Sequence, residues 1–328
     1  MSGFPNHRAG SFSRYGVPVL VTESNTSPSY LTCPLSRKIS EKELGLPKNL
    51  AMPFPETLNA KPRVIFFTDF DGTITLQDTN DYITDNYGMG KAERRQLFHA
   101  VIDNTDTFRN TFQKMLDSWK MPFPEILKIL TDNITLDPHF KDFMVWARSH
   151  DVPVIVLSSG MIPIIETLLR HLLGEELMRD IEVVANETQL RAPGNSLDRG
   201  DGWTIKFHDD SGFGHDKSLT IRPYADAIAK MPRHEDRPTL LYAGDGVSDL
   251  SAARETDLLF ARAGQDLITY CEREGIPFTE FESWKSILEE TKDIYDGKKT
   301  VKRIAEEGLK KHRTYSIEHG EQMRPTTH

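Results

Sequence analysis

Apolar runs of strand length alternate with helical segments along most of this chain, and this alternation limits the fold more than any other feature. Strands buried on both faces appear as short, continuous runs of β-branched, aliphatic and aromatic residues. Five such runs are Val64–Thr68, Val152–Leu157, Ile181–Ala185, Thr239–Ala243 and Leu258–Ala261. Strands that alternate with helices predict an α/β fold, a doubly wound parallel sheet with helices on both faces.

The segments between these runs show the helical period. Residues 79–135 are helical in character, with breaks at 88–90, 104–105 and 121–124. Asp137 and Pro138 predict the start of a further helix, as an N-cap followed by proline at the first helical position. Helices are also expected at 162–173, 218–231 and 249–256, and a hairpin strand at Trp203–Phe207.

Composition and pattern divide the chain into four parts. Residues 1–62 hold eight of the 19 prolines and show no sustained period, which predicts an extended or disordered extension with one helical turn near Ser40–Leu44. Residues 63–78 and 137–297 are expected to form the core, and 79–136 a helical cap. The basic tail at 298–328 is expected to be a solvated, frayed helix.

Charge and cysteine content exclude several classes of protein. With 40 basic and 49 acidic residues the net charge is −9, so a nucleic-acid binder has no support from composition. No run reaches the roughly 18 apolar residues of a spanning helix. Cys33 and Cys271 cannot build a disulfide framework or a metal-binding pair.

Basic residues concentrate at the two ends. The first 62 residues carry seven basic and four acidic residues, and 298–313 carries seven and two, so the remainder is strongly acidic. If this acidic central region binds an anionic substrate, it needs a positively charged group at the binding site. Arg8 and Arg14 lie among serines as in a transit peptide, but Pro5 and Pro18 oppose an amphipathic helix there. We expect a cytoplasmic protein, with mitochondrial targeting as the alternative.

Two polar segments follow directly on predicted strands, at the sheet edge where ligands of such folds bind. Asp69 and Asp71 stand two residues apart before Gly72, so one carboxylate can act as a nucleophile and the other as a proton donor and acceptor. The second segment, 158–160, places a serine hydroxyl before small residues and a helix, which suits a phosphate oxygen.

Two further segments complete the set. Lys217 begins a predicted helix, against the usual preference for cations at helix C-termini. Asp245 and Asp249 follow a predicted strand among glycines and suggest oxygen ligands for Mg²⁺.

In their order, Asp69–Thr73, Ser158, Lys217 and Gly244–Asp249 resemble the signature of the haloacid dehalogenase-type phosphohydrolases. The resemblance covers about 63–284. The run DFDGTIT at 69–75, with the long interval before Ser158, is similar to the phosphoserine phosphatase-like branch, which carries a small helical cap. The segment 259–286 is similar to the diketo-methylthiopentane phosphate phosphatases of methionine salvage and to fungal phosphatases.

This resemblance implies a Rossmann-like parallel sheet core with a helical cap and a Mg²⁺-dependent phosphatase. It gives Asp69 the attack on phosphorus, which forms an aspartyl-phosphate, and it has Asp71 protonate the leaving oxygen and then activate water. Dehalogenases of the superfamily lack an acid at the position of Asp71 and phosphoenzyme ion pumps carry threonine there, so Asp71 favours a phosphatase.

The resemblance also implies the binding residues. Thr73, Ser158, Ser159, Gly160 and Lys217 would hold the substrate's phosphoryl group, with Lys217 also offsetting the charge of the nucleophile. The Asp69 carboxylate, the Asp71 carbonyl and the Asp245 carboxylate would bind Mg²⁺, with Asp249 in support.

The expected substrate is a small phosphorylated metabolite. Phosphoserine phosphatases carry an acidic residue nine positions after the nucleophile, here Asp78, and a cap arginine for the substrate carboxylate. Thr111 falls at the arginine position, with Arg109 the nearest alternative. A site without that arginine leaves a carboxylate unpaired, so we expect polyol, sugar or methionine-salvage phosphates to exceed phosphoserine.

Other clusters have plainer interpretations. The polar set at 208–210 and 215–216 fits no standard zinc spacing and predicts a hairpin tip. Phe98, Phe108, Phe112 and Trp119 at helical spacings predict a cap core in preference to a ligand cage.

Three alternatives remain open: a phosphoserine phosphatase, a phosphomutase that returns the phosphoryl group to its substrate, and a non-catalytic phosphate-binding scaffold. A scaffold would be free to lose one of Asp69, Asp71, Lys217 or Asp245, yet all are present. No nucleic-acid or membrane partner is expected, and the protein is expected to be a monomer or a homodimer.

Overall fold

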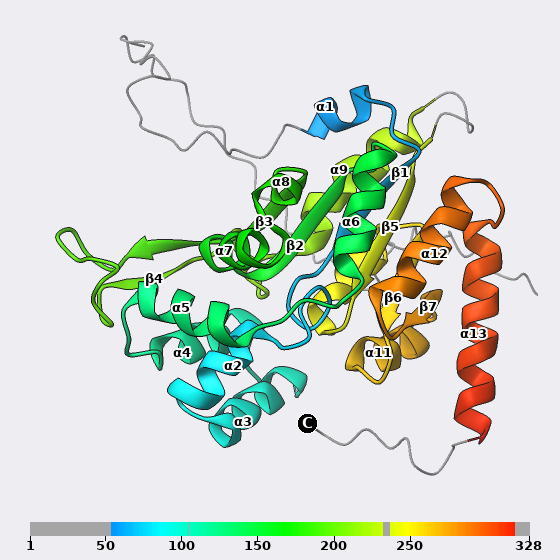
Figure 1. The fold of residues 1–328 in the computed structure, drawn as a ribbon. Helices are drawn as coiled ribbons and strands as arrows, with labels where there is room; N and C mark the ends of the chain where they lie inside the picture. The colour runs from blue at the N-terminus through cyan, green and yellow to red at the C-terminus, as the bar shows by residue number, and fades with distance from the viewer. Residues whose placement is uncertain (1–53, 104, 232–236, 319–328) are drawn as a thin grey trace, which may run out of the picture. The chain divides into compact units, whose positions relative to one another are not determined.

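A computed structural model of the chain describes residues 54–103, 105–231 and 237–318, and these contain a seven-stranded sheet in the order β4-β3-β2-β1-β5-β6-β7 (Figure 1). All neighbouring strands pair in parallel except β3 and β4, which form the antiparallel hairpin. The expected α/β fold with a parallel sheet is confirmed. The strands are β1 (Val64–Thr68), β2 (Val154–Met161), β3 (Ile181–Leu190), β4 (Trp203–Lys206), β5 (Thr239–Gly244), β6 (Leu258–Arg262) and β7 (Phe278–Phe281).

The sheet separates two hydrophobic cores because successive side chains of a strand point to opposite faces. In β1, Phe66 belongs to one core, while Ile65 and Phe67 belong to the other. Both sets are fully buried, which is why this strand is a continuous apolar run rather than an alternating one.

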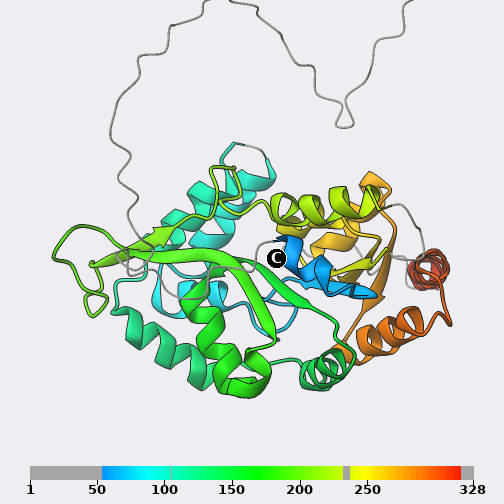
Figure 2. The ribbon, with the colours of Figure 1, turned by 90° about the horizontal axis from the view of Figure 1, so that it is seen from above.

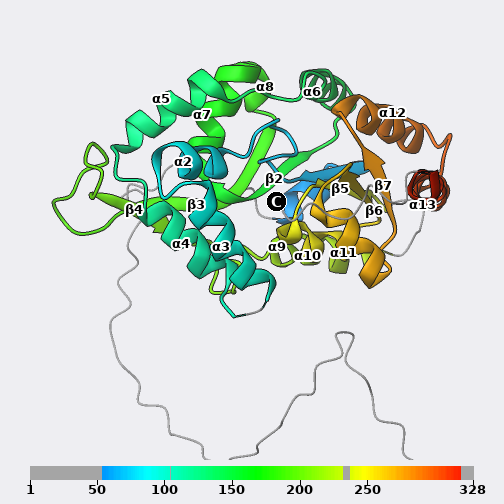
Figure 3. The same ribbon diagram turned by 90° about the horizontal axis from the view of Figure 1, so that it is seen from below.

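Helices cover both faces of the sheet (Figures 2 and 3). Residues of α6, α7, α8 and α12 belong to the core with Phe66, and residues of α9, α10 and α11 to the core with Phe67. The bounds are α6 (Phe140–Ser149), α7 (Ile162–Leu173), α8 (Glu175–Met178), α9 (Lys217–Ala229), α10 (Leu250–Ala253), α11 (Asp266–Glu274) and α12 (Trp284–Tyr295), with a 3₁₀ turn η2 (Val247–Asp249) before α10.

Four helices lie between β1 and α6 and form the cap, and the breaks predicted at 88–90 and 104–105 fall between them. The third break lies at 118–122 rather than 121–124, because Phe123 and Pro124 already belong to the first turn of α5. They are α2 (Thr79–Tyr87), α3 (Lys91–Ile102), α4 (Phe108–Asp117) and α5 (Phe123–Asn133). The β3–β4 hairpin packs against them. Trp203 of β4 donates its indole N–H to the Met121 carbonyl at 3.1 Å, and its ring meets Phe123 edge-on at a centroid distance of 5.0 Å.

Several boundaries differ from the expectations. The helix expected from Asp137 begins at Phe140, and Asp137 instead accepts the His139 backbone N–H at 3.0 Å in the turn before it. Strand β2 begins at Val154 and runs on to Met161, and β3 continues to Leu190, because it pairs with the hairpin strand β4.

The two ends also differ. The prediction of a frayed, solvated tail at 298–328 is wrong for the part that the structure describes. Helix α13 (Val301–Glu318) packs on β7, with Ile304 and Ala305 buried. Within the predicted extension, α1 (Phe54–Asn59) is helical and its Leu58 packs on the second core. The turn expected near Ser40–Leu44 lies outside the described residues. No described helix has both the length and the apolar character needed to cross a bilayer.

Candidate active site

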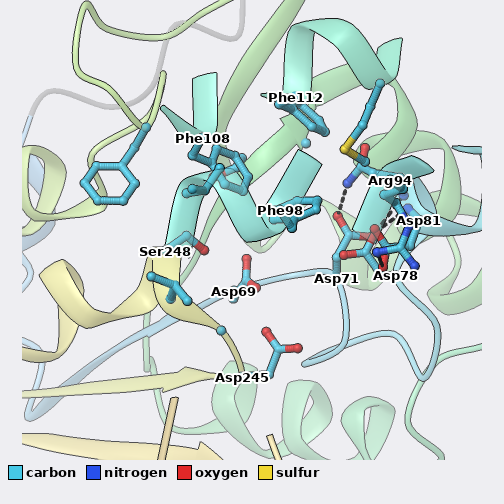
Figure 4. Close-up of a pocket in the computed structure, with 18 of the residues that line it drawn as sticks. Asp69, Asp71, Asp78, Asp81, Arg94, Phe98, Phe108, Phe112, Asp245 and Ser248 are labelled. Carbon is cyan, nitrogen blue, oxygen red and sulfur yellow. Dashed lines mark hydrogen bonds and ion pairs between the residues drawn. The ribbon is translucent and has the colours of Figure 1, made fainter. Parts of the chain in front are cut away.

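A pocket of about 770 Å³ lies between the cap and the ends of the core strands. Its polar side holds the predicted motif residues Asp69, Asp71 and Asp245, which follow β1 and β5. Figure 4 shows these carboxylates facing a group of aromatic rings from the cap. The remaining polar lining comes from the Ser158–Gly160 segment at the end of β2, from the start of α2 and α3, from Ser248, and from Tyr270 and Arg273 of α11.

The turn after β1 allows the Asp245 carboxylate to lie close to Asp69. Gly72 has a φ of 70°, a conformation that side-chain-bearing residues rarely adopt. A Cβ at Gly72 would also lie 2.3 Å from an Asp245 carboxylate oxygen. Glycine is therefore required both for the turn and for the approach of Asp245 to the nucleophile candidate.

Asp71 is held in place from the cap side. One carboxylate oxygen accepts the Thr79 backbone N–H at 2.8 Å, and the other accepts the Asn80 side-chain amide at 3.0 Å. Burial, together with the nearby Asp78 carboxylate, raises the pKa of Asp71 well above its usual value. A buried carboxyl with a raised pKa is suited to carry a proton at neutral pH and to donate it.

Lys217 is the central cation. Its ammonium donates to Asp69 at 2.7 Å and to Asp249 at 2.6 Å, and the side chain is fully buried. Burial by itself lowers the pKa of Lys217, but the two carboxylates outweigh it and raise the pKa above its usual value. Its position as the first residue of α9, behind the N-cap Asp216, is thus explained by these two ion pairs rather than by the helix.

Asp249 organises the end of β5. Its carboxylate accepts from the Lys217 ammonium, the Tyr242 hydroxyl at 2.5 Å and the backbone N–H groups of Asp245 and Gly246 at 2.9 and 3.0 Å. Four donors occupy most of what one carboxylate can accept. Asp249 therefore orients Lys217 and the Asp245 loop, and it is poorly placed to bind an ion directly.

The carboxylates here form the only set of metal-ligating type found among the described residues. One oxygen each from Asp69, Asp245 and Asp249 lies within 4.8 Å of the others. Burial raises the pKa of Asp69 and of Asp245, and neighbouring carboxylates raise it further, while Lys217 opposes both shifts. Crowded, buried oxygen donors with one lysine to balance them suit a hard divalent cation such as Mg²⁺.

The segment Ser158–Gly160 forms one wall beside Asp71. The Ser158 hydroxyl accepts the Gly160 backbone N–H at 2.9 Å. A Cβ at Gly160 would stand 3.3 Å from an Asp71 carboxylate oxygen, so this glycine lets the segment approach Asp71 closely. The structure thus brings Ser158, Ser159 and Gly160 to the pocket, as predicted.

Asp78 also lines the pocket, but one of its oxygens is already engaged. It is the N-cap of α2 and accepts the backbone N–H groups of Asn80 and Asp81 at 2.8 and 2.9 Å. Arg94 of α3 binds Asp81 at 2.6 Å and Asp85 at 2.7 Å, which ties α2 to α3 at the pocket rim.

Two predicted substrate-binding residues lie elsewhere. Thr73 is fully buried, does not line the pocket, and its carbonyl accepts the Trp284 indole N–H at 2.9 Å. Arg109 also does not line the pocket: its guanidinium donates to the Asp209 carbonyl at 2.5 Å and lies over the Phe207 ring. The structure therefore does not bring Arg109, the alternative to Thr111 for the family's arginine, to the pocket lining. Thr111, at the family's arginine position, is fully buried.

The aromatic residues of the cap divide between two roles. Trp119 is buried and donates to the Thr84 hydroxyl at 2.9 Å, as expected for cap core. Phe112 is buried in the hydrophobic core and Phe98 and Phe108 pack against it, which confirms the predicted cap core. The same three rings also line the pocket and face the carboxylates (Figure 4). Their helical spacing is the same in both cases, because a pocket wall and a core face both exclude water.

The polar set at 208–216 lies in the loop that joins β4 to α9. The prediction of a hairpin tip there is wrong, because the β3–β4 hairpin turns at 191–202 instead. Asp209 accepts backbone N–H groups from Ser211 and Asp216, and His215 contacts the Ser158 carbonyl at 2.8 Å. Sequence reasoning missed the roles of His215, Asn80 and Tyr242. Only the N-cap pattern before α2 gave any signal for Asn80, and none pointed to the other two.

Residues 66–254 match the family of haloacid dehalogenase-like hydrolases. The matched region spans more than half of the chain and includes every motif residue described above. The chain belongs to this family. Its nucleophile candidate Asp69 with Asp71 two residues later identifies it as a phosphatase of the haloacid dehalogenase-like family, as predicted from the motifs.

Curated relatives extend over most of the chain. It is 49% identical to polyol phosphate phosphatase PYP1 of Saccharomyces cerevisiae over 74% of this chain and 99% of that protein. It is 50% identical to Pdp3-interacting factor 1 of Schizosaccharomyces pombe over 72% and 97%. A 2-hydroxy-3-keto-5-methylthiopentenyl-1-phosphate phosphatase of Bacillus cereus is 27% identical over 71% and 97%.

Proposed function

We propose that this phosphatase hydrolyses a small polyol or sugar phosphate through an aspartyl-phosphate, with Mg²⁺ as its cofactor. The observation that carries the proposal is the pairing of Asp69 with Lys217 at 2.7 Å, beside Asp71 at the base of the pocket. A nucleophilic carboxylate, a cation that balances it and an acid–base carboxyl are the minimum set for this chemistry.

In the first half-reaction, an Asp69 oxygen bonds to phosphorus as the bond from phosphorus to the ester oxygen breaks. Asp71 gives its proton to that departing oxygen, so the product alcohol leaves neutral. In the second, Asp71 takes a proton from water, whose oxygen bonds to phosphorus and releases Asp69 and inorganic phosphate. The raised pKa of Asp71 supports both roles, because the group must hold a proton in one step and accept one in the next.

Mg²⁺ would be held by the Asp69 and Asp245 carboxylates and the Asp71 backbone carbonyl, and it supplies charge compensation for the phosphoryl oxygens. Asp249 would not bind the ion directly but would orient its ligands, because it accepts hydrogen bonds from Lys217 and from the Asp245 backbone N–H. We expect activity to be lost in excess EDTA. Ca²⁺ should substitute poorly, because its looser geometry misplaces a nucleophile that is also a ligand.

The lining of the pocket supports a polyol or sugar phosphate. Asp78, with one oxygen capping α2, keeps a second oxygen that can accept a hydrogen bond from a substrate hydroxyl. Phe98, Phe108 and Phe112 offer an apolar wall for the carbon skeleton. The 49% identity to a protein named polyol phosphate phosphatase agrees with this choice.

The deciding experiment is a phosphate-release screen. Sorbitol 6-phosphate, ribitol 5-phosphate, glycerol phosphate, sugar phosphates, a methionine-salvage phosphate and phosphoserine would be compared by kcat/KM. We expect the polyol or sugar phosphates to lead, and Asp78→Ala to change the ranking more than it changes hydrolysis of p-nitrophenyl phosphate. A lead of tenfold or more for phosphoserine would overturn the substrate assignment, while leaving the phosphatase reaction intact.

The other candidates have less support. A phosphomutase would need a sugar bisphosphate primer, so release of inorganic phosphate without one decides against it. A scaffold role has one point in its favour, since the fission yeast relative is named for an interaction. Asp69, Asp71 and Asp245 line one pocket and Lys217 is bonded to Asp69, and this complete set favours catalysis, because binding alone does not need a nucleophile and an acid.

A further inference from the structure

We propose that His215 is a positioning residue of the phosphatase, which holds the Ser158–Gly160 segment in the shape that receives the phosphoryl group. The proposal rests on the phosphatase reaction and not on which phosphate ester is the substrate. Its first support is a direct contact: the fully buried imidazole lies with Nδ1 2.8 Å from the Ser158 carbonyl oxygen.

The backbone of β2 explains why a side chain is needed there. Strand β2 pairs regularly with β3 up to Leu157, and the register then shifts before pairing resumes at Met161. A bulge of this kind re-aims side chains but takes backbone groups out of the ladder. Two carbonyls in the bulge are instead satisfied by side chains: that of Ser158 by His215, and that of Ser159 by the Asn186 amide at 2.6 Å.

The protonation state of His215 follows from its partner. A carbonyl oxygen can only accept, so Nδ1 must carry the proton. Burial lowers the pKa of His215 to about 4, although the Ser158 hydrogen bond opposes the shift. The ring is thus a neutral donor across the pH range in which a phosphatase works, and it adds no charge beside the substrate.

A short chain of contacts leads from His215 to the reacting groups. The Ser158 carbonyl is fixed by His215, the Ser158 hydroxyl accepts the Gly160 N–H, and Gly160 stands against the Asp71 carboxylate. Movement of Ser158 would therefore disturb both the Ser158–Gly160 segment, which would hold the phosphoryl group, and the surroundings of the Asp71 carboxylate. Misplacement of such groups by 1 Å can cost about 10²-fold in rate.

Hydrogen bonds within the loop and from the cap fix the loop that carries His215, so His215 can hold Ser158 in a defined position. Asp209 accepts the Asp216 backbone N–H at 2.7 Å, and the cap residue Arg109 binds the Asp209 carbonyl and, through its own N–H, the Gly212 carbonyl at 2.8 Å. Two residues after His215, the same chain supplies Lys217 to Asp69. One anchored loop thus sets both Ser158 and the lysine.

The test compares His215→Leu with His215→Asn in the full-length protein with Mg²⁺. The asparagine amide can place an N–H near the position of Nδ1, whereas leucine has no donor. With p-nitrophenyl phosphate as substrate and inorganic phosphate as competitive inhibitor, we expect His215→Leu to lower kcat/KM and weaken phosphate inhibition about 10- to 100-fold. His215→Asn should remain within a few-fold of the unmodified protein in both measurements.

A neighbouring histidine provides the matched control. His208 is exposed, and its ring lies 4.5 Å from the His215 ring between centroids, at a tilt of 54°. Its contact with Asn186 uses the backbone N–H, so His208→Leu should change neither measurement. If His215→Leu does not fold, His215→Gln replaces it, because its longer amide cannot occupy the Nδ1 position. The proposal is overturned if phosphate inhibition is unchanged in His215→Leu, or in His215→Gln where that variant replaces it, or if it is equally lost in His215→Asn.

Discussion

At the scale of single residues, the main feature of the active site is an excess of buried carboxylates over cations. Asp69, Asp71, Asp245 and Asp249 meet one another with only Lys217 among them, and burial raises the pKa of three of these carboxyls. Such crowding of like charge works against stability in the free protein. The proposed mechanism would relieve this repulsion, because it places a divalent cation among the carboxylates and a proton on Asp71.

The nucleophile can be tested by the change Asp69→Asn. We expect phosphate release to be abolished, because an amide cannot attack phosphorus as a carboxylate does. The melting temperature should hold or rise, since the change removes a buried charge and leaves Lys217 paired with Asp249 at 2.6 Å. Circular dichroism provides the control for folding. Near-normal turnover by this variant would refute the mechanism.

Glu290 of α12 predicts a pH effect on stability away from the active site. Burial raises its pKa from the usual 4.5 to about 7, and one of its oxygens is buried without a hydrogen-bond partner among the described residues. The folded state then binds a proton that the unfolded state releases between pH 4.5 and 7, so the stability contributed at this site falls as pH rises through that window.

Glu290→Gln should therefore be more stable than the unmodified protein at pH 8, by on the order of 1 kcal/mol after solvent screening, and about equal to it at pH 4. Urea unfolding at the two pH values measures the difference. The exposed neighbour change Glu289→Gln is the control, and a stability gain at pH 8 no larger than that control's would show that burial of Glu290 has no such effect.

At the scale of elements, α13 covers the edge strand β7. The helix lies directly on the strand because Gly308 faces Thr279: a Cβ there would come within 2.8 Å of the Thr279 Cα and Cβ. His312 joins the same contact and binds Glu280 and Glu272, the latter at 2.9 Å. An edge strand covered in this way cannot pair with another chain.

Gly308→Ala separates helix propensity from packing. In an open helix this change stabilises by about 1 kcal/mol. Here the added methyl group meets strand backbone, which cannot move as a flexible side chain would, and overpacking costs about 1–3 kcal/mol. We expect a net loss of stability and a lower melting temperature. Lys302→Ala, at an exposed position of α13, is the control; a higher melting temperature for Gly308→Ala would show that the helix is not seated on β7.

At the scale of the whole molecule, catalysis depends on parts that are distant in sequence but adjacent in space. The pocket draws on β1, the cap, the ends of β2 and β5, and α11. Every predicted motif residue lies between 69 and 249, and the residues of both cores that the structure describes lie after residue 57.

Deletion of residues 1–49 should leave kcat/KM and the melting temperature nearly unchanged. The segment offers little apolar periodicity to bury, and it lies outside the described residues, so the expectation rests on sequence alone. Comparison of the full-length and shortened proteins by phosphate release and calorimetry tests it. A large drop in either quantity would mean that the extension stabilises the core or completes the site.

The sequence by itself determined the parallel sheet, most of the helix breaks in the cap and the set of polar residues that gather at one edge of the sheet. These follow from local patterns: buried strands are continuous apolar runs, glycines mark breaks, and Asp69, Asp71, Lys217 and Asp245 stand at element ends, where a parallel sheet gathers its ligands. The closeness of Asp69 and Asp71 needed no coordinates, because two carboxylates two residues apart after a strand share one edge of the sheet. Which of them attacks phosphorus stays a prediction from the family resemblance.

Tertiary structure alone decided which side chains complete the site. Arg109 stands two residues from the family's arginine position in the sequence, yet in the structure it binds the Asp209 carbonyl in a loop of the core. His215 belongs to a loop that the sequence marked only as polar, yet it donates to the Ser158 carbonyl, which the bulge in β2 takes out of the sheet ladder. Phe98 and Trp119 share a helical pattern, but only Phe98 lines the pocket. Such assignments depend on contacts between segments far apart in the chain, and periodicity carries information only about the residue's own element.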